Sequence, residues 1–213
     1  MPKLVAFLRA INVGGHNVKM TDLCAIFAKL GLNEAESFIA SGNLIFTAPR
    51  APAKVLEQKI EAALAASLGY AVSAFLRTEA EIAAVAAYRP FTKAQFNASV
   101  AYNVAFLADP LDAAAKKTVL TMKTDIDGFY VNGREVYWLC TLRQSDSKFS
   151  NALFERALKR RATWRGMQSV QKLVAKYGFT AQAAPTEQTP MRDELQQLPG
   201  VRRATAADPR KRR

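Results

Sequence analysis

The feature that most restricts the fold of this 213-residue chain is its alternation of short strand-like and helix-like segments. Residues 3–11 form an apolar run bounded by Pro2 and by Asn12-Val13-Gly14-Gly15, which is typical of a strand. Residues 20–30, 55–68 and 82–86 carry apolar side chains at helical spacing, whereas runs at 36–40, 43–48 and 70–77 are strand-like. The first part of the chain therefore follows the order β-α-β-β-α-β plus a helix.

The second half repeats this order. Residues 100–108 alternate as a strand does, and residues 112–122 are helical with Asp112 as the cap. Asn132-Gly133 tolerates the positive φ angles of a type I′ turn and predicts a hairpin across residues 129–140. Helices over 149–158, with Ser147 as N-cap, and over 170–177 flank a short strand at Ala162-Thr163-Trp164. The repeat predicts an α+β fold of two tandem ferredoxin-like α/β plaits plus a basic C-terminal tail.

Domain boundaries follow from this repeat and from a change in composition. We predict a first plait at residues 1–92, a second and more basic plait at 93–180, and a linker at Pro90–Ser99. Apolar periodicity fades after Ala181, where prolines interrupt a segment that ends in Arg210-Lys211-Arg212-Arg213. Residues 181–213 are therefore expected to form a Pro/Arg-rich, partly disordered tail. The two open sheet faces are expected to pack against each other or to cover core, which leaves few aromatic residues free to stack on RNA bases.

The net charge of +12 is concentrated in the second half of the chain. Residues 1–92 carry a net charge of +2, residues 93–180 of +7, and residues 181–213 of +3. Such an excess predicts attraction for polyanions, with nucleic acid or a phosphate-bearing small molecule as the partner. A basic surface that only aids solubility explains the charge equally well.

The composition excludes several classes of protein. Two cysteines and one histidine are too few for a disulfide framework or a Cys/His zinc site. Asp125-x-Asp127 lacks the further ligands of an EF-hand, so we expect no metal, and we expect no cofactor. No apolar run reaches the roughly 18 residues that a membrane helix needs. Met1-Pro2-Lys3-Leu4 leads straight into a strand without a signal-peptide cleavage region. We therefore expect a cytoplasmic protein that does not bind membranes, and leave its oligomeric state open.

Three segments together resemble a known bacterial family. They are Leu8–Gly15 with the following Met20-Thr21-Asp22-Leu23, then Phe38–Phe46, and finally Ser147–Asn151 with Ala162–Val170. This pattern is similar to domain of unknown function 1697, whose chains open with Leu-Leu-Arg-Gly-Ile-Asn-Val-Gly-Gly, carry a Ser-Gly-Asn hairpin and end near Thr-Arg-Asn-Trp-x-Thr-Val. The resemblance spans about residues 3–178 and implies two plait-like α+β subdomains, but no reaction. Ala10 stands where the family has glycine, and Gly166-Met167 where it has Asn-Trp.

The loop after the first strand is the strongest candidate for a binding site. Gly14 and Gly15 can turn backbone N–H groups toward an anion at a helix start, with Arg9 and Asn12 beside them. A bidentate contact from Arg9 would suit phosphate or carboxylate. The alternative is a tight β-to-α connection with Arg9 in a structural ion pair, because neither a P-loop nor a Rossmann fingerprint is present.

Two further segments supply candidates. Ser41 and Asn43 flank a hairpin glycine, for which a self-bonded turn is the simpler explanation. Lys148 and Asn151 at a helix start, together with Arg165, can hold an anion, although a solvated basic face is the alternative.

These residues lead to one hypothesis and two alternatives. We expect an anionic ligand, a nucleotide or nucleic acid, to bind in a basic cleft between the plaits. The first alternative is a small-molecule enzyme of unknown reaction that uses the same cleft, with carboxylates or a lysine in acid–base roles. The second is a protein-interaction scaffold with an exposed apolar patch. The sequence alone leaves the chain's status as an enzyme open.

Overall fold

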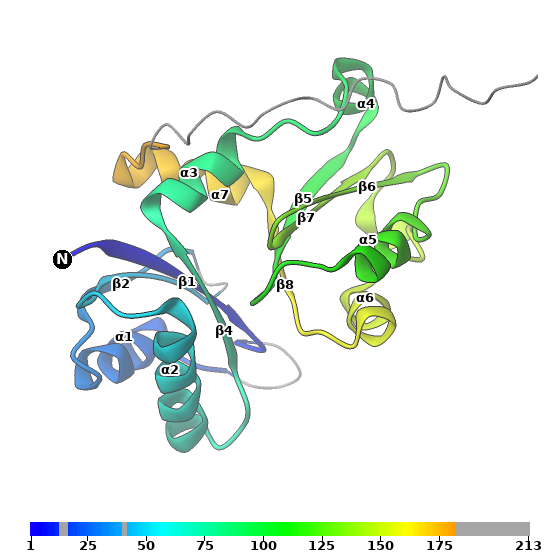
Figure 1. The fold of residues 1–213 in the computed structure, drawn as a ribbon. Helices are drawn as coiled ribbons and strands as arrows, with labels where there is room; N and C mark the ends of the chain where they lie inside the picture. The colour runs from blue at the N-terminus through cyan, green and yellow to red at the C-terminus, as the bar shows by residue number, and fades with distance from the viewer. Residues whose placement is uncertain (13–16, 40–41, 182–213) are drawn as a thin grey trace, which may run out of the picture. The chain divides into compact units, whose positions relative to one another are not determined.

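The first half of the chain forms a four-stranded antiparallel sheet in the computed structural model, which describes residues 1–12, 17–39 and 42–181 (Figure 1). Its strands lie in the order β2-β3-β1-β4, as in a ferredoxin-like plait. The elements in chain order are β1 (Lys3–Arg9), α1 (Met20–Lys29), β2 (Asn33–Ser37), β3 (Asn43–Thr47), α2 (Ala53–Leu68) and β4 (Ser73–Thr78). Helical spacing puts Leu23, Phe27, Ile60 and Leu64 on the buried sides of α1 and α2, where they pack against one face of the sheet.

The second half forms a separate sheet with the equivalent strand order, β6-β7-β5-β8. Its elements are β5 (Ala101–Phe106), α5 (Ala113–Leu120), β6 (Asp127–Asn132), β7 (Glu135–Cys140), α6 (Asn151–Leu158) and β8 (Thr163–Gly166). Gly133 has a φ of +58° in the β6–β7 turn, as the Asn-Gly pair predicts. Asp112 caps α5 by accepting a hydrogen bond from the Ala115 N–H. Two four-stranded antiparallel sheets with interleaved helices confirm the predicted α+β fold class.

Each plait is followed by a helix beyond its closing strand. Helix α3 (Glu79–Ala87) follows β4, and α7 (Met167–Tyr177) follows β8. The two helices lie side by side (Figure 1). Both contribute buried side chains to a hydrophobic cluster that also contains residues from the two sheets. Both sheets belong to one compact unit of the chain.

The two open sheet faces pack against each other, as expected from the aromatic residues. The rings of Phe7 on β1 and Phe106 on β5 stack with centroids 4.0 Å apart and planes 4° apart. Val5, Val104 and Tyr137 are fully buried in the same cluster. These aromatic faces are therefore part of the core and are not exposed for base stacking.

The strand registers show how closely the halves repeat each other. Val5 pairs with Arg77 across β1 and β4, and Val104 pairs with Arg165 across β5 and β8. Phe7 and Phe106, whose rings stack between the two sheets, lie two residues after these valines. Equivalent positions of the two plaits therefore meet at the seam between the sheets.

Several local predictions differ from the structure. Ser150, not Ser147, caps α6, because the Ser147 hydroxyl donates instead to the Asp127 carboxylate on β6. The predicted linker at residues 90–99 contains a short helix, α4 (Lys93–Ala98), which begins with a Thr92/Gln95 capping box. The second strand begins at Asn33 rather than at residue 36, and a 3₁₀ turn, η1 (Gln144–Asp146), precedes α6. The predicted boundaries of the two plaits are not tested by these elements and stay predictions.

Candidate functional site

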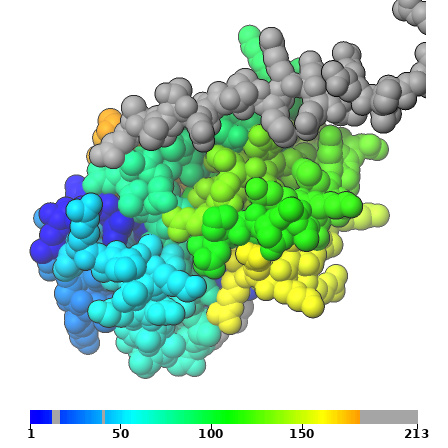
Figure 2. Space-filling view, viewed as in Figure 1, coloured from blue at the N-terminus to red at the C-terminus, as the bar shows by residue number. Residues whose placement is uncertain are grey.

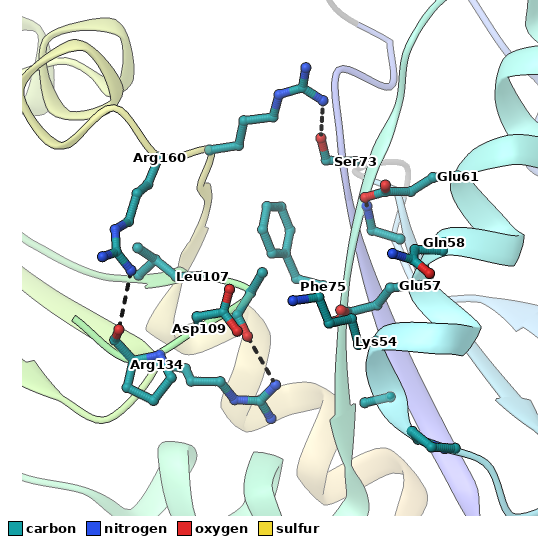
Figure 3. Close-up of a pocket in the computed structure, with 16 residues that line it drawn as sticks. Lys54, Glu57, Gln58, Glu61, Ser73, Phe75, Leu107, Asp109, Arg134 and Arg160 are labelled. Atoms are coloured by element: carbon teal, nitrogen blue, oxygen red, sulfur yellow. Dashed lines mark hydrogen bonds between the residues drawn. The ribbon is translucent and has the colours of Figure 1, made fainter. Parts of the chain in front are cut away.

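A cavity of about 860 Å³ lies at the seam between the two plaits (Figure 3). One side comes from α2 and β4, and the other from the segment after β5, the β6–β7 turn and the segment after α6. On the molecular surface, α2 (cyan) borders the residues that precede and form α5 (green) (Figure 2). The side chains that line the cavity include Lys54, Glu57, Gln58, Glu61, Ser73, Phe75, Leu107, Asp109, Arg134, Arg160 and Arg161.

Carboxylates on α2 form the acidic wall of this seam cavity. Glu57 Oε1 accepts a hydrogen bond from the Leu76 N–H at 2.8 Å, and Glu61 Oε1 accepts one from the Ala74 N–H at 2.9 Å. Both N–H groups belong to β4, an edge strand whose outer backbone groups have no neighbouring strand. Burial raises the pKa of the Glu57 carboxyl, and the hydrogen bond from Leu76 opposes this only in part.

The opposite wall is basic. Arg160 pairs with Asp112 at 2.8 Å and donates to the Pro110 carbonyl at 3.2 Å, while Arg134 pairs with Glu81. Arg161 Nη1 donates to the neutral Ser73 hydroxyl at 3.1 Å. Among the described residues, no carboxylate forms an ion pair with Arg161. Its positive charge therefore faces the cavity without a protein counter-ion from this part of the chain.

Apolar side chains lie between the two walls. Phe75 on β4 and Leu107 after β5 line the cavity in the space between α2 and Arg160 (Figure 3). The site thus places arginines on one side and the carboxylates of Glu57 and Glu61 on the other, with Asp109 beside the arginines and Lys54 beside the glutamates. Phe75 and Leu107 are almost fully buried, and the exposed apolar residues of the lining are Pro52, Ala53, Ala108 and Pro110. Such an arrangement suits a ligand with a negative group at one end and hydrogen-bond donors at the other.

The residues that the sequence singled out as ligand-binding, where the structure describes them, do not line this cavity. Arg9 forms a bidentate ion pair with Glu155 on α6, with N–O distances of 2.7 and 2.6 Å. Glu155 also accepts a hydrogen bond from the Ala162 N–H. Arg9 therefore makes the structural ion pair that the sequence left as an alternative. Its strand partner Ser73 does line the cavity.

Arg165 and Asn43 are brought together in the core. Arg165 Nε donates to Asn43 Oδ1, and its Nη2 donates to the Leu8 carbonyl at 2.8 Å. Asn43 also donates to the Phe38 carbonyl. Burial lowers the pKa of Arg165 to about 10, so the side chain stays charged at neutral pH.

The remaining candidates occupy separate places. Asn12 Oδ1 accepts from the Val18 N–H at 2.7 Å, and Asn151 Oδ1 accepts from the Trp164 indole at 3.0 Å. Lys148 is exposed, whereas Gly14, Gly15 and Ser41 lie outside the described residues, as does the tail from residue 182. None of the described candidates lines the seam cavity. Their role as ligand-binding residues stays a prediction.

The family-like segments nevertheless converge. The Leu8 N–H donates to the Gly42 carbonyl at 2.8 Å, which joins the end of β1 to the hairpin before β3. A Cβ at Gly42 would lie 3.2 Å from the Ile11 Cβ, and the Gly42 φ of +71° also favours glycine. Arg165 from the third segment reaches Leu8 and Asn43 in the same region. The described parts of the first and second segments therefore lie side by side.

Sequence reasoning identified only part of the cavity. It singled out the basic run Lys159-Arg160-Arg161 but did not assign these residues to a site. It missed Glu57 and Glu61, although acidic residues four apart on the apolar helix 55–68 were a visible signal. Within the described part of the chain, no group of three or more potential metal ligands comes together. No helix there is long and apolar enough to cross a membrane.

Comparisons with known proteins support the fold. A solved structure of the conserved bacterial protein SP0830 from Streptococcus pneumoniae matches with a TM-score of 0.63 and 26% sequence identity. The match covers 81% of this chain and 96% of that chain. No curated protein matches the chain.

A family model described as "Protein of unknown function (DUF1697)" matches residues 1–137. This range contains the first two of the three family-like segments and ends before Ser147–Val170. The chain therefore belongs to the DUF1697 family, a family of unknown function.

Proposed function

We propose that the seam cavity binds a small molecule that carries a phosphate group. The observation that carries this proposal is Arg161, whose guanidinium lines the cavity and is held by the neutral hydroxyl of Ser73. Guanidinium groups bind phosphate through paired, charge-assisted hydrogen bonds. The cavity volume of about 860 Å³ lies within the usual range for small-molecule sites.

A nucleotide is the ligand class that best matches the two walls. Its phosphate would lie toward Arg160 and Arg161, and its base would lie against the exposed apolar residues Pro52, Ala53 and Pro110. Amino or hydroxyl donors at the other end would meet the carboxylates of α2. Each part of the ligand then faces a surface of complementary polarity.

Nucleic acid fits the same cavity less well. Its continuous phosphate backbone would also approach Glu57, Glu61 and Asp109, which repel it. The sheet aromatics Phe106 and Tyr137, which would have to stack on bases, are fully buried.

The test is a thermal-shift and calorimetric screen of nucleoside mono-, di- and triphosphates against the wild type, Arg161→Ala and Arg156→Ala. Arg156 is an exposed arginine on α6 outside the cavity, so its variant removes the same charge at a neighbouring place. We expect Arg161→Ala to bind at least about tenfold more weakly, and Arg156→Ala to bind as the wild type does.

Two results would refute the proposal. One is the absence of binding by every nucleotide, and the other is an equal loss in both variants, which would indicate a general charge effect. Affinity for an oligonucleotide that exceeds nucleotide affinity and falls steeply with salt would favour nucleic acid instead.

One observation favours an enzyme as a second candidate. Glu57 is buried in the cavity wall, and its raised pKa brings the carboxyl closer to the range used in acid–base catalysis. If a bound compound is consumed by the wild type, Glu57→Gln should bind it with similar affinity but turn it over at least about a hundredfold more slowly. Unchanged turnover in that variant would remove Glu57 from the chemistry. The interaction-scaffold alternative stays a prediction.

A further inference from the structure

A second cavity, of about 510 Å³, lies at the start of α7 and is separate from the seam cavity. Its lining includes Arg89, Asn103 and Gln144 together with the first turn of α7. None of the described residues that line it is aspartate or glutamate. In contrast to the seam cavity, it therefore combines a cation and neutral amides without an opposing negative charge.

The N-terminus of α7 opens into this second cavity. Gly166 is the N-cap, no side chain caps the helix, and its first turn contains no acidic residue. The first N–H groups of a helix have no partner within the helix and carry its positive end charge. Residues Gly166 to Ser169, which include these groups, line the cavity.

The equivalent helix of the first plait, α3, has the side-chain cap that α7 lacks. Thr78 caps α3, and Glu81 Oε2 accepts a hydrogen bond from the Thr78 N–H at 2.8 Å. The registers place Thr78 opposite Leu4 and Gly166 opposite Asn103. The first plait thus supplies its own carboxylate at this position, whereas the second has a glycine and a cavity.

The side chain of Asn103 is a second, independent feature of this cavity. It takes the position of the apolar Leu4, yet the residue is only 6% exposed. Oδ1 accepts from Gln144 Nε2 at 3.2 Å, but the buried Nδ2 has no acceptor in the described structure. Because buried donors are nearly always hydrogen-bonded, a donor without a partner beside a cavity points to an acceptor supplied by a ligand.

Arg89 adds the positive charge. Its Nη1 donates to the carbonyls of Ala86 and Tyr88, which fixes the guanidinium at the end of α3. For Nη2 and Nε, the described residues supply no acceptor, and no described carboxylate pairs with Arg89.

We propose that this second cavity binds a small oxyanion, a phosphate or carboxylate group, which takes the place that Glu81 occupies in the first plait. The oxyanion accepts hydrogen bonds from the first turn of α7 and from Asn103, and Arg89 balances its charge. This site does not depend on the ligand proposed for the seam cavity.

The test is a titration of the full chain with inorganic phosphate, and separately with acetate, at constant ionic strength, followed by ¹⁵N NMR. We expect saturable shifts of the Gln168 and Ser169 amides and of the Asn103 side-chain NH₂. Comparison of the two probes shows which oxyanion is preferred. Shifts that do not saturate, or that equal those caused by chloride, would overturn the proposal.

Two variants separate binding from folding. Gln168→Glu places a carboxylate in the first turn of α7, which should not lower the melting temperature because acidic residues stabilise helix starts. We expect it to weaken oxyanion affinity at least about tenfold through charge repulsion. Lys172→Gln, at an exposed position of the same helix, changes the net charge equally and should stay within about twofold of the wild type. Equal effects of the two changes would contradict the site.

Asn103→Leu introduces the residue type that the first plait has at the equivalent position, Leu4. We expect this variant to melt at a higher temperature, because it removes a buried donor without a partner, and to lose the saturable shifts. Wild-type oxyanion affinity in Asn103→Leu would exclude the amide from the site. Arg161→Ala should leave the shifts at α7 unchanged, which distinguishes this site from the seam cavity.

Discussion

Two buried arginines occupy equivalent positions and connect the plaits. Arg77 Nη2 donates to the Leu107 carbonyl, and Arg165 Nη2 donates to the Leu8 carbonyl, each at 2.8 Å. Arg77 lies over the Phe106 ring, as Arg165 lies over Phe7. In this way, an arginine on the last strand of each plait donates a hydrogen bond to a backbone carbonyl of the other plait.

The first prediction concerns Arg77, whose side chain is fully buried and pairs with Glu135 at 2.6 Å. Arg77→Met leaves that carboxylate without its cation, so we expect the free energy of unfolding to fall by about 3–5 kcal/mol. Arg143→Met removes an exposed arginine from its pair with Asp146 and should cost no more than about 1 kcal/mol. Urea unfolding measures both, and similar losses would contradict this role of Arg77.

The second prediction concerns Ala10, which has a φ of +68° at the position where the family pattern has glycine. A left-handed alanine is strained, so Ala10→Gly should stabilise the protein by about 0.5–1 kcal/mol. Ala62→Gly, at an exposed position in the middle of α2, should destabilise it by about 1 kcal/mol. Chemical denaturation of both variants checks these opposite signs. A loss of stability in Ala10→Gly would show that the backbone of Ala10 is not strained.

At the scale of elements, β4 is an edge strand protected by carboxylates. Its outward N–H groups at Ala74, Leu76 and Thr78 donate to Glu61, Glu57 and Glu81 respectively. These glutamates satisfy the backbone where a further strand would otherwise pair. Two of them, Glu57 and Glu61, also form the acidic wall of the seam cavity.

The third prediction follows from the raised pKa of Glu57, which burial causes. A carboxyl whose folded-state pKa lies above its unfolded value stabilises the fold at low pH and loses that contribution as pH rises through the folded pKa. Glu57→Gln cannot ionise but can still accept from Leu76, so its stability relative to the wild type should increase from pH 4 to pH 7. Unfolding free energies measured across this range test the sign. A difference that does not change with pH would contradict it.

Local patterns predicted most elements but not their long-range contacts. The Asn132-Gly133 turn and the Gly178 end of α7 follow from backbone preferences that are readable in the sequence. Ser147 was assigned wrongly as a cap because its partner Asp127 is 20 residues away in the chain. The Thr92/Gln95 capping box that begins α4 is a signal in the sequence that the prediction of a linker at residues 90–99 does not use.

The seam cavity could not be predicted in the same way. Its walls come from segments that meet only when the two sheets pack, and periodicity within one segment carries no information on that packing. Arg9 illustrates the point, because its partner Glu155 lies 146 residues later.

At the scale of the whole molecule, one hydrophobic cluster contains residues from both sheets. Because the two plaits share this cluster, we expect them to unfold together. Both tryptophans, Trp138 and Trp164, lie in the second plait, so their fluorescence reports on that half, whereas far-UV circular dichroism reports on both. Phe7→Ala, in the first plait, should shift the two unfolding curves equally and cost about 3–5 kcal/mol. Leu120→Ala, at a 54% exposed position, should shift neither by more than about 0.5 kcal/mol. A fluorescence transition unaffected by Phe7→Ala would show that the halves unfold independently.

The seam between the two plaits is the proposed site for a phosphorylated small molecule. The most direct measurement is a crystal structure of the protein with the nucleotide that gives the largest thermal shift. We expect its phosphate within hydrogen-bond distance of the Arg161 guanidinium and its base against the exposed Pro52, Ala53 and Pro110. A nucleotide bound outside this cavity, with Arg161 still bonded only to Ser73, would rule out this site.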